Sequence, residues 1–317
     1  MSPTADDARR GAGSAPGTGG AHEVQAVAAA DFETDTRSLR AQYWTTEPAE
    51  LIGPVTDHAA EGGALLAKAE GEGERAGEAR RALADALAET RLIAGRIQYH
   101  GLKDREGAEL SFRQARQAAD EAGNPLLGAA ALGHLALLAD ASDDAGADVL
   151  AEARALAGRG APTGRVTAWL DAVEAERAAG AGENERALRL ISDAETSLAA
   201  AGSDAQDWLD WCTPSGLGVL KGLVQLQAGL TSQARRTLLY SMAPLAPDEH
   251  AQRSLFYLGL AAVEAAEGEE YEACGYACRS LEHIEACGDV LGVRAALDPY
   301  LHESCVADLY ENLFPST

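Results

Sequence analysis

Residues 255–282 read LFYLGLAAVEAAEGEEYEACGYACRSLE, and they contain the pattern that indicates the fold. Small and apolar residues recur at helical spacing on both sides of Gly268, a residue type that often ends a helix in a left-handed conformation. The window ACGYACRS at 273–280 places its first, fifth and eighth residues on one helical face. Ala261, twelve residues before that window, is small enough to let one helix lie close to the next. The stretch predicts a helical hairpin.

The window recurs along the chain at similar spacing. Four earlier windows share its pattern: AELSFRQA at 108–115, GADVLAEA at 146–153, ALRLISDA at 187–194 and ARRTLLYS at 234–241. A small residue stands twelve or thirteen positions before each of the five windows: Gly95, Gly133, Ala175, Gly222 and Ala261. Only the last three windows are preceded by a turn glycine: Gly182, Gly229 and Gly268. Two helices in each repeat of about 40 residues are typical of helical repeat arrays.

These repeats predict an all-α fold, a right-handed superhelix (α-solenoid) of about five to six tetratricopeptide-like (TPR-like) helix pairs. Helices at about 47–68 and 76–100 would extend the array before the first window. The chain after Asp289, through Leu301 and Tyr310 to Leu313, is expected to form capping helices, since a solenoid otherwise exposes the apolar face of its last repeat. Residues 1–37, Gly-rich and acidic, are predicted to be a disordered arm, and 38–315 to be the repeat domain.

Composition and charge narrow the class of protein. Hydrophobic residues make up 46% of the chain but aromatic residues only 5%, so the core is expected to consist mainly of Ala, Leu and Val. A net charge of −24 argues against direct contacts with nucleic acid, and it favours either simple solubility or a cationic partner. We find no signal-peptide pattern and no apolar run long enough to span a membrane. A cytoplasmic protein with free thiols is therefore expected.

The layout resembles the C-terminal TPR domain of actinobacterial Xre-type helix-turn-helix transcriptional regulators. The resemblance is carried by LRAQYWTTEPAELI (39–52), IAGRIQYHGLKDREGAELSFRQARQAADEAGNPLL (93–127), DWLDWC (207–212) and the hairpin at 255–282. It implies a ligand-sensing or docking domain in a regulatory pathway. Those regulators carry a DNA-binding helix-turn-helix ahead of the repeats, whereas the first 37 residues here show no three-helix pattern. An effect on transcription would therefore be indirect, through a partner.

The sequence contains none of the common catalytic, phosphate-binding or metal-binding motifs. TPSGLG at 213–218 lacks the strand that a nucleophile elbow requires, and no phosphate-binding loop, zinc-helix motif or calcium loop occurs. Cys274, Cys278, His283 and Cys287 have spacings that would suit a metal, but on one helix the two pairs point in opposite directions. We therefore interpret the cysteines as small core residues. The sequence predicts no enzyme, no cofactor and no metal.

Candidate partner-binding positions come from the first helix of each pair, which lines the inner surface of such a superhelix. Counted from the windows, they are Ile93, Ile97, His100, Ala131, Leu135, Trp169, Glu176, Val219 and Leu223. This mostly apolar set would suit an amphipathic helix, a hydrophobic ligand or a second copy of the chain, unless the superhelix itself buries it. His134, like His100, is interpreted either as a polar contact to a ligand or as a structural histidine.

Trp208 and Trp211, three residues apart in the longest interval between windows, are expected to share a helical face. They would either dock the inserted segment or form an exposed aromatic anchor for a partner. The leading hypothesis is a scaffold that binds a protein, peptide or small-molecule partner in a regulatory pathway. The alternatives are a self-assembling homo-oligomer, through the groove or the cysteine-rich end, and an enzyme whose site the sequence does not reveal.

Overall fold

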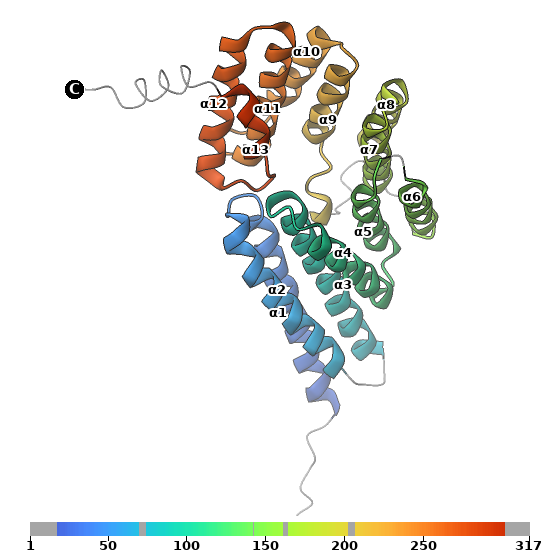
Figure 1. The fold of residues 1–317 in the computed structure, drawn as a ribbon. Helices are drawn as coiled ribbons and strands as arrows, with labels where there is room; N and C mark the ends of the chain where they lie inside the picture. The colour runs from blue at the N-terminus through green and yellow to red at the C-terminus, as the bar shows by residue number, and fades with distance from the viewer. Residues whose placement is uncertain (1–17, 70–73, 142, 161–163, 202–206, 302–317) are drawn as a thin grey trace, which may run out of the picture.

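The computed structural model describes residues 18–69, 74–141, 143–160, 164–201 and 207–301, and every regular element in these ranges is a helix (Figure 1). Most helices pack on their neighbours in the sequence. The first half contains α1 (Thr18–Gln42), α2 (Pro48–Lys68), α3 (Glu74–Arg96), the π-helix η1 (Ile97–Gly101), α4 (Arg105–Ala122), α5 (Pro125–Leu138) and α6 (Asp144–Ala157). The second half contains α7 (Gly164–Gly180), α8 (Asn184–Ala200), the 3-10 helix η2 (Asp207–Leu209), α9 (Pro214–Gln227), α10 (Thr231–Met242), α11 (His250–Glu267), α12 (Glu270–Cys287), α13 (Arg294–Leu297) and η3 (Asp298–Tyr300). None of the described helices is long and apolar enough to cross a membrane.

The predicted hairpins are present. The five windows lie in α4, α6, α8, α10 and α12, and each of these helices packs extensively on the helix before it. Fourteen of the fifteen predicted packing residues are buried, and the other, Ser241, is half-buried. The one-face spacing therefore identified the contact surface of every second helix.

Two of the small residues in the first helices make the close approach that the sequence predicts. A Cβ on Gly95 of α3 would overlap the ring of Phe112, the central residue of the first window. A Cβ on Gly222 of α9 would lie 2.7 Å from Leu238, the central residue of the fourth window. At both positions only glycine lets the large partner side chain fill the space between the helices.

The turns between paired helices are stabilised in three different ways. Gly182, Gly229 and Gly268 have positive φ angles of 80°, 75° and 83°, as expected for helix-ending glycines. Lys103 occupies the same position before the first window and adopts φ 55° without being a glycine.

Among the described residues of the turn between α5 and α6, none has a positive φ. Arg177 of α7 holds this turn instead, because its guanidinium donates hydrogen bonds to the carbonyls of Ala136 (2.8 Å) and Asp143 (2.8 Å). A long-range side chain thus satisfies carbonyls that a local turn would otherwise satisfy.

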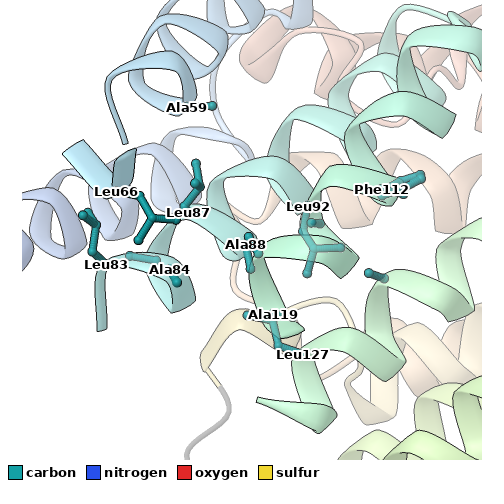
Figure 2. Packing of buried hydrophobic residues seen from close by; sticks show 14 of the residues in the cluster. Ala59, Leu66, Leu83, Ala84, Leu87, Ala88, Leu92, Phe112, Ala119 and Leu127 are labelled. Atoms are coloured by element: carbon teal, nitrogen blue, oxygen red, sulfur yellow. The ribbon is translucent and has the colours of Figure 1, made fainter. Parts of the chain in front are cut away.

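The core is built largely from Ala and Leu, as the composition predicts. Figure 2 shows part of the cluster where α2, α3, α4 and α5 meet. Phe112 is one of two phenylalanines in this cluster and is fully buried. Small side chains such as Ala59, Ala84 and Ala88 (Figure 2) surround the leucines, which allows the helix axes to lie close together.

The prediction of a disordered arm over 1–37 is wrong for residues 18–37, which belong to α1. Ala29, Phe32, Thr36, Leu39 and Tyr43 are buried at alternating intervals of three and four residues, and α1 packs against α3. The stripe is helical in spacing, but Ala and Thr make it weakly apolar, so the Gly-rich composition upstream concealed it. Residues 1–17 lie outside the described residues.

The end of the described chain contacts the beginning. Figure 1 shows the lower end of α12 next to the start of α2, and Val290 belongs to the same buried cluster as Leu51 and Ile97. The backbone N–H of Asp289 donates to Glu47 (3.3 Å). Of the predicted capping segment, α13 and η3 pack on α11 and α12, and Tyr310 and Leu313 lie outside the described residues.

Candidate functional site

A cavity of about 750 Å³ lies between several of the helices. Its walls come from α7, α9 and α11, from the ends of α1 and α3, from η1 and α5, and from the segment between η2 and α9. The volume is in the range that accommodates a small organic ligand. Most of the wall is apolar, and polar groups are few.

A buried arginine, Arg96, closes one end of the cavity. Its guanidinium carbon lies 4.0 Å from the ring centroid of Tyr43 and 4.1 Å from that of Trp211. Its Nη1 forms an ion pair with Asp210 (3.1 Å), whose other oxygen accepts a hydrogen bond from Trp44 Nε1 (2.6 Å). With 3% of the Arg96 side chain exposed, the charge is neutralised by one carboxylate and covered by aromatic rings.

The local backbone at this point is unusual. The π-helix η1 follows directly after Arg96 and carries His100 into the cavity wall. Burial, with Arg96 and Lys103 nearby, lowers the pKa of His100 to about 3. Single π-helical turns occur often at functional sites, because they redirect side chains that a regular helix would place elsewhere.

A second histidine, His134 of α5, lies within a group of aromatic rings. Its ring stacks on Phe112 (centroids 4.8 Å apart) and tilts against Trp169 (4.8 Å) and Trp211 (5.1 Å). Neither ring nitrogen has a hydrogen-bond partner in the described part of the chain. Burial, with Arg96 and His100 nearby, lowers the pKa of His134 well below its usual value, so the ring is neutral at physiological pH.

The part of the wall formed by α9 and α11 is apolar. Val219, Leu220 and Leu223 of α9 line it together with Leu255 and Phe256 of α11. Val219 and Phe256 also belong to the core cluster beneath. The apolar lining is therefore rigidly supported, which favours a preformed site over one that collapses when empty.

Glu176 of α7 is the isolated charge of this wall. Its side chain is exposed within the cavity, yet protein surrounds it closely enough for desolvation to raise the pKa of its carboxyl. Within the described residues it forms no ion pair and no hydrogen bond. Ala172 and Ala179 flank it one turn away on each side and also line the cavity.

The predicted groove residues divide into two groups. Five of them line the cavity: His100, Trp169, Glu176, Val219 and Leu223. Ile93, Ile97 and Ala131 are instead fully buried in the core, and Leu135 packs against it. The groove assignment is wrong for these four, because the first helices of the early repeats are covered by α1, α2 and the neighbouring helices.

Trp208 and Trp211 do not share a helical face. Trp208 belongs to the short 3-10 helix η2 and packs against two core clusters, whereas Trp211 follows that helix and lines the cavity. Neither side chain is exposed. Trp208 docks the segment, as one of the two alternatives predicted, and the exposed aromatic anchor is not found.

The cysteines are buried. Cys274 and Cys278 lie in the core beside Ala273 and Ala277, and Cys287 is 5% exposed. His283 turns away from them and forms a 2.8 Å contact through Nδ1 with Nδ1 of His250. Burial raises the pKa of Cys287 to about 11, and over the described ranges no group of three or more potential ligands is placed to hold a metal ion. Cys305 lies outside these ranges.

Sequence reasoning missed the closed end of the cavity. Sequence patterns do not select Arg96, Asp210 and Tyr43, because their contacts join distant segments, more than a hundred residues apart in the case of Asp210. The motifs YW at 43–44 and DWLDWC at 207–212 were the available signal, since paired aromatics and acids near a helix end are typical of a binding wall. Nothing in either motif indicates that they meet.

The fold and the cavity together define an all-helical protein, over its described residues, with a mostly apolar pocket. Comparison with known proteins adds no family: no family model matches the chain, and no curated protein is significantly similar to it.

Proposed function

We propose that this protein is a ligand-binding protein whose cavity takes a mainly apolar molecule. The observation that carries the proposal is the 750 Å³ cavity with its supported aliphatic and aromatic walls. A preformed apolar pocket with a few placed polar groups is the usual form of a small-molecule site. The volume favours a small ligand over a whole amphipathic helix.

We further infer that the five helix pairs form a TPR-like right-handed superhelix with this cavity on its concave side. The regular windows, the left-handed turn residues and the close approach at Gly95 and Gly222 support that inference. In the resemblance to Xre-type regulators, such a domain senses a ligand and transmits its binding to a partner. A cytoplasmic regulatory role, acting on transcription indirectly, is the corresponding biological proposal.

Binding without chemistry fits the polar groups of the site. A catalytic histidine is usually held in one tautomer by a hydrogen bond to a second group. His134 has no such partner in the described structure, and its ring is fixed by stacking instead. The self-assembly alternative has less support at the cysteine-rich end, because Cys274, Cys278 and Cys287 are all buried.

The proposal is tested with Nile red, a neutral apolar dye whose emission rises in apolar surroundings. The wild-type protein is expected to bind it saturably, with one equivalent per chain. Filling the cavity from two helices with Ala172→Phe and Leu223→Trp is expected to weaken binding at least tenfold, or about 1.4 kcal/mol.

The matched control places the same two side chains on exposed positions, Ala155→Phe and Leu239→Trp. It should bind the dye as the wild type does. Binding that is not saturable, or that survives the cavity-filling pair unchanged, contradicts a ligand site in this cavity.

A further inference from the structure

The cavity has an unbalanced charge. Five side chains of acidic or basic residues line the cavity: Arg96, His100, His134, Glu176 and Asp210. Arg96 and Asp210 form an ion pair and cancel. Both histidines have lowered pKa values and are neutral near pH 7. Glu176 is left as a single carboxyl group, whose ionised form has no counter-charge among the described residues.

The surroundings of Glu176 leave room for a ligand group. Ala172 and Ala179 precede and follow it by about one turn on the same face of α7, so no large side chain of its own helix covers the carboxylate. Trp169 lies two turns away on this face, about 10 Å along the helix axis. Between and beside them the wall is apolar and aromatic.

An isolated carboxylate in an apolar wall is costly unless an opposite charge or hydrogen-bond donor reaches it. A cationic group supplies both, and nearby aromatic faces also attract cations. The whole chain carries a net charge of −24, which raises the local concentration of cations and repels anions.

Resting on the binding function proposed above, we propose that the ligand is a cationic amphiphile. An apolar body would fill the space between the tryptophans and α9, and an ammonium group would pair with the carboxylate of Glu176. Glu176 is thereby the residue that determines specificity, selecting a monocation over neutral or anionic molecules with the same apolar body.

The test uses three probes with the same chain length and different head groups: decylamine, decanol and decanoate. Their affinities are measured by displacement of Nile red and by calorimetry, below their critical micelle concentrations and at pH 7.5. The wild-type protein is expected to bind decylamine at least tenfold more tightly than decanoate, with decanol between them.

Variants separate the effect of the Glu176 carboxylate on binding from that of the rest of the cavity. Glu176→Gln is expected to weaken decylamine binding at least tenfold and to change decanol binding less than twofold. Glu176→Asp, which keeps the charge, should retain the preference. Glu185→Gln removes one exposed carboxylate from α8, outside the cavity, and should leave all three affinities unchanged.

The outcomes distinguish the two proposals. Equal affinity for decylamine and decanoate in the wild-type protein overturns the cationic ligand and leaves the apolar cavity standing. The same conclusion follows if Glu176→Gln weakens decylamine and decanol equally, or if Glu185→Gln acts like Glu176→Gln. If Nile red binds saturably but decylamine does not displace it, the cationic ligand is overturned, and if Nile red itself does not bind saturably, the binding function fails.

Discussion

Arg96 and Asp210 are 114 residues apart in the sequence and form an ion pair of 3.1 Å at the closed end of the cavity. The pair joins the end of α3 to the segment between η2 and α9. Trp44, near the end of α1, donates to the same carboxylate. Three distant parts of the chain are therefore held together by one acidic side chain.

Replacing Asp210 by Asn is expected to destabilise the fold by about 3 kcal/mol, because it leaves the Arg96 guanidinium buried without a counter-charge. The stacked Tyr43 and Trp211 rings compensate only in part. Urea unfolding measures the change. Asp148→Asn, on the exposed face of α6, is the control and should stay within about 0.5 kcal/mol of wild type. Equal stability of the two variants would show that the pair has no net effect.

Gly95→Ala is expected to destabilise the protein by about 1–3 kcal/mol, since the new methyl group overlaps the Phe112 ring in a packed core. The control is Gly275→Ala, also inside a helix but with no atom within 4 Å of the added Cβ. There the better helix propensity of Ala should stabilise the protein by roughly 0.5–1 kcal/mol. Thermal unfolding reports both signs, and a stabilised Gly95→Ala would contradict the close approach of α3 and α4.

The repeat windows were predictable because helix pairing depends on local spacing. Residues four and seven positions apart must share a face, whatever the rest of the chain does. The turn at Lys103 shows the limit of that reasoning, because a lysine there takes the left-handed conformation that is expected of a glycine. The resemblance to TPR regulators remains a prediction.

Part of the cavity lining could be predicted from the sequence. The expectation that the first helix of each pair lines the binding surface correctly selects Trp169, Glu176, Val219 and Leu223. The same expectation selects Ile93 and Ile97, which are buried. The difference comes from α1 and α2, which cover α3. The Arg96–Asp210 pair depends on how the segment between η2 and α9 packs against the end of α3, which no local pattern contains.

Stability should depend on pH through His134. Its folded-state pKa is lowered by burial, so between that value and about 6.5 the unfolded chain binds a proton that the folded chain does not. This contribution is fully present above the unfolded pKa and is lost as the pH falls. His134→Phe removes it while keeping a flat ring. From pH 7.5 to 5.5 the wild type should lose about 1.4 kcal/mol more than the variant. Parallel pH curves would contradict a neutral, buried His134.

The loop between α12 and α13 lies against η1 at Gly292. This residue has φ 61°, and a Cβ there would overlap the carbonyl oxygen of His100 in the cavity wall. Gly292→Ala should therefore detach residues 288–292 from η1 and increase amide hydrogen exchange in α13 and around His100. Gly229→Ala is the control, because it has the same type of backbone (φ 75°) but no atom within 4 Å of an added Cβ. The control should show only the strain of a positive φ, about 1 kcal/mol, confined to the α9–α10 turn. If Gly292→Ala leaves exchange around His100 unchanged, the contact between residues 288–292 and η1 does not stabilise this part of the cavity wall.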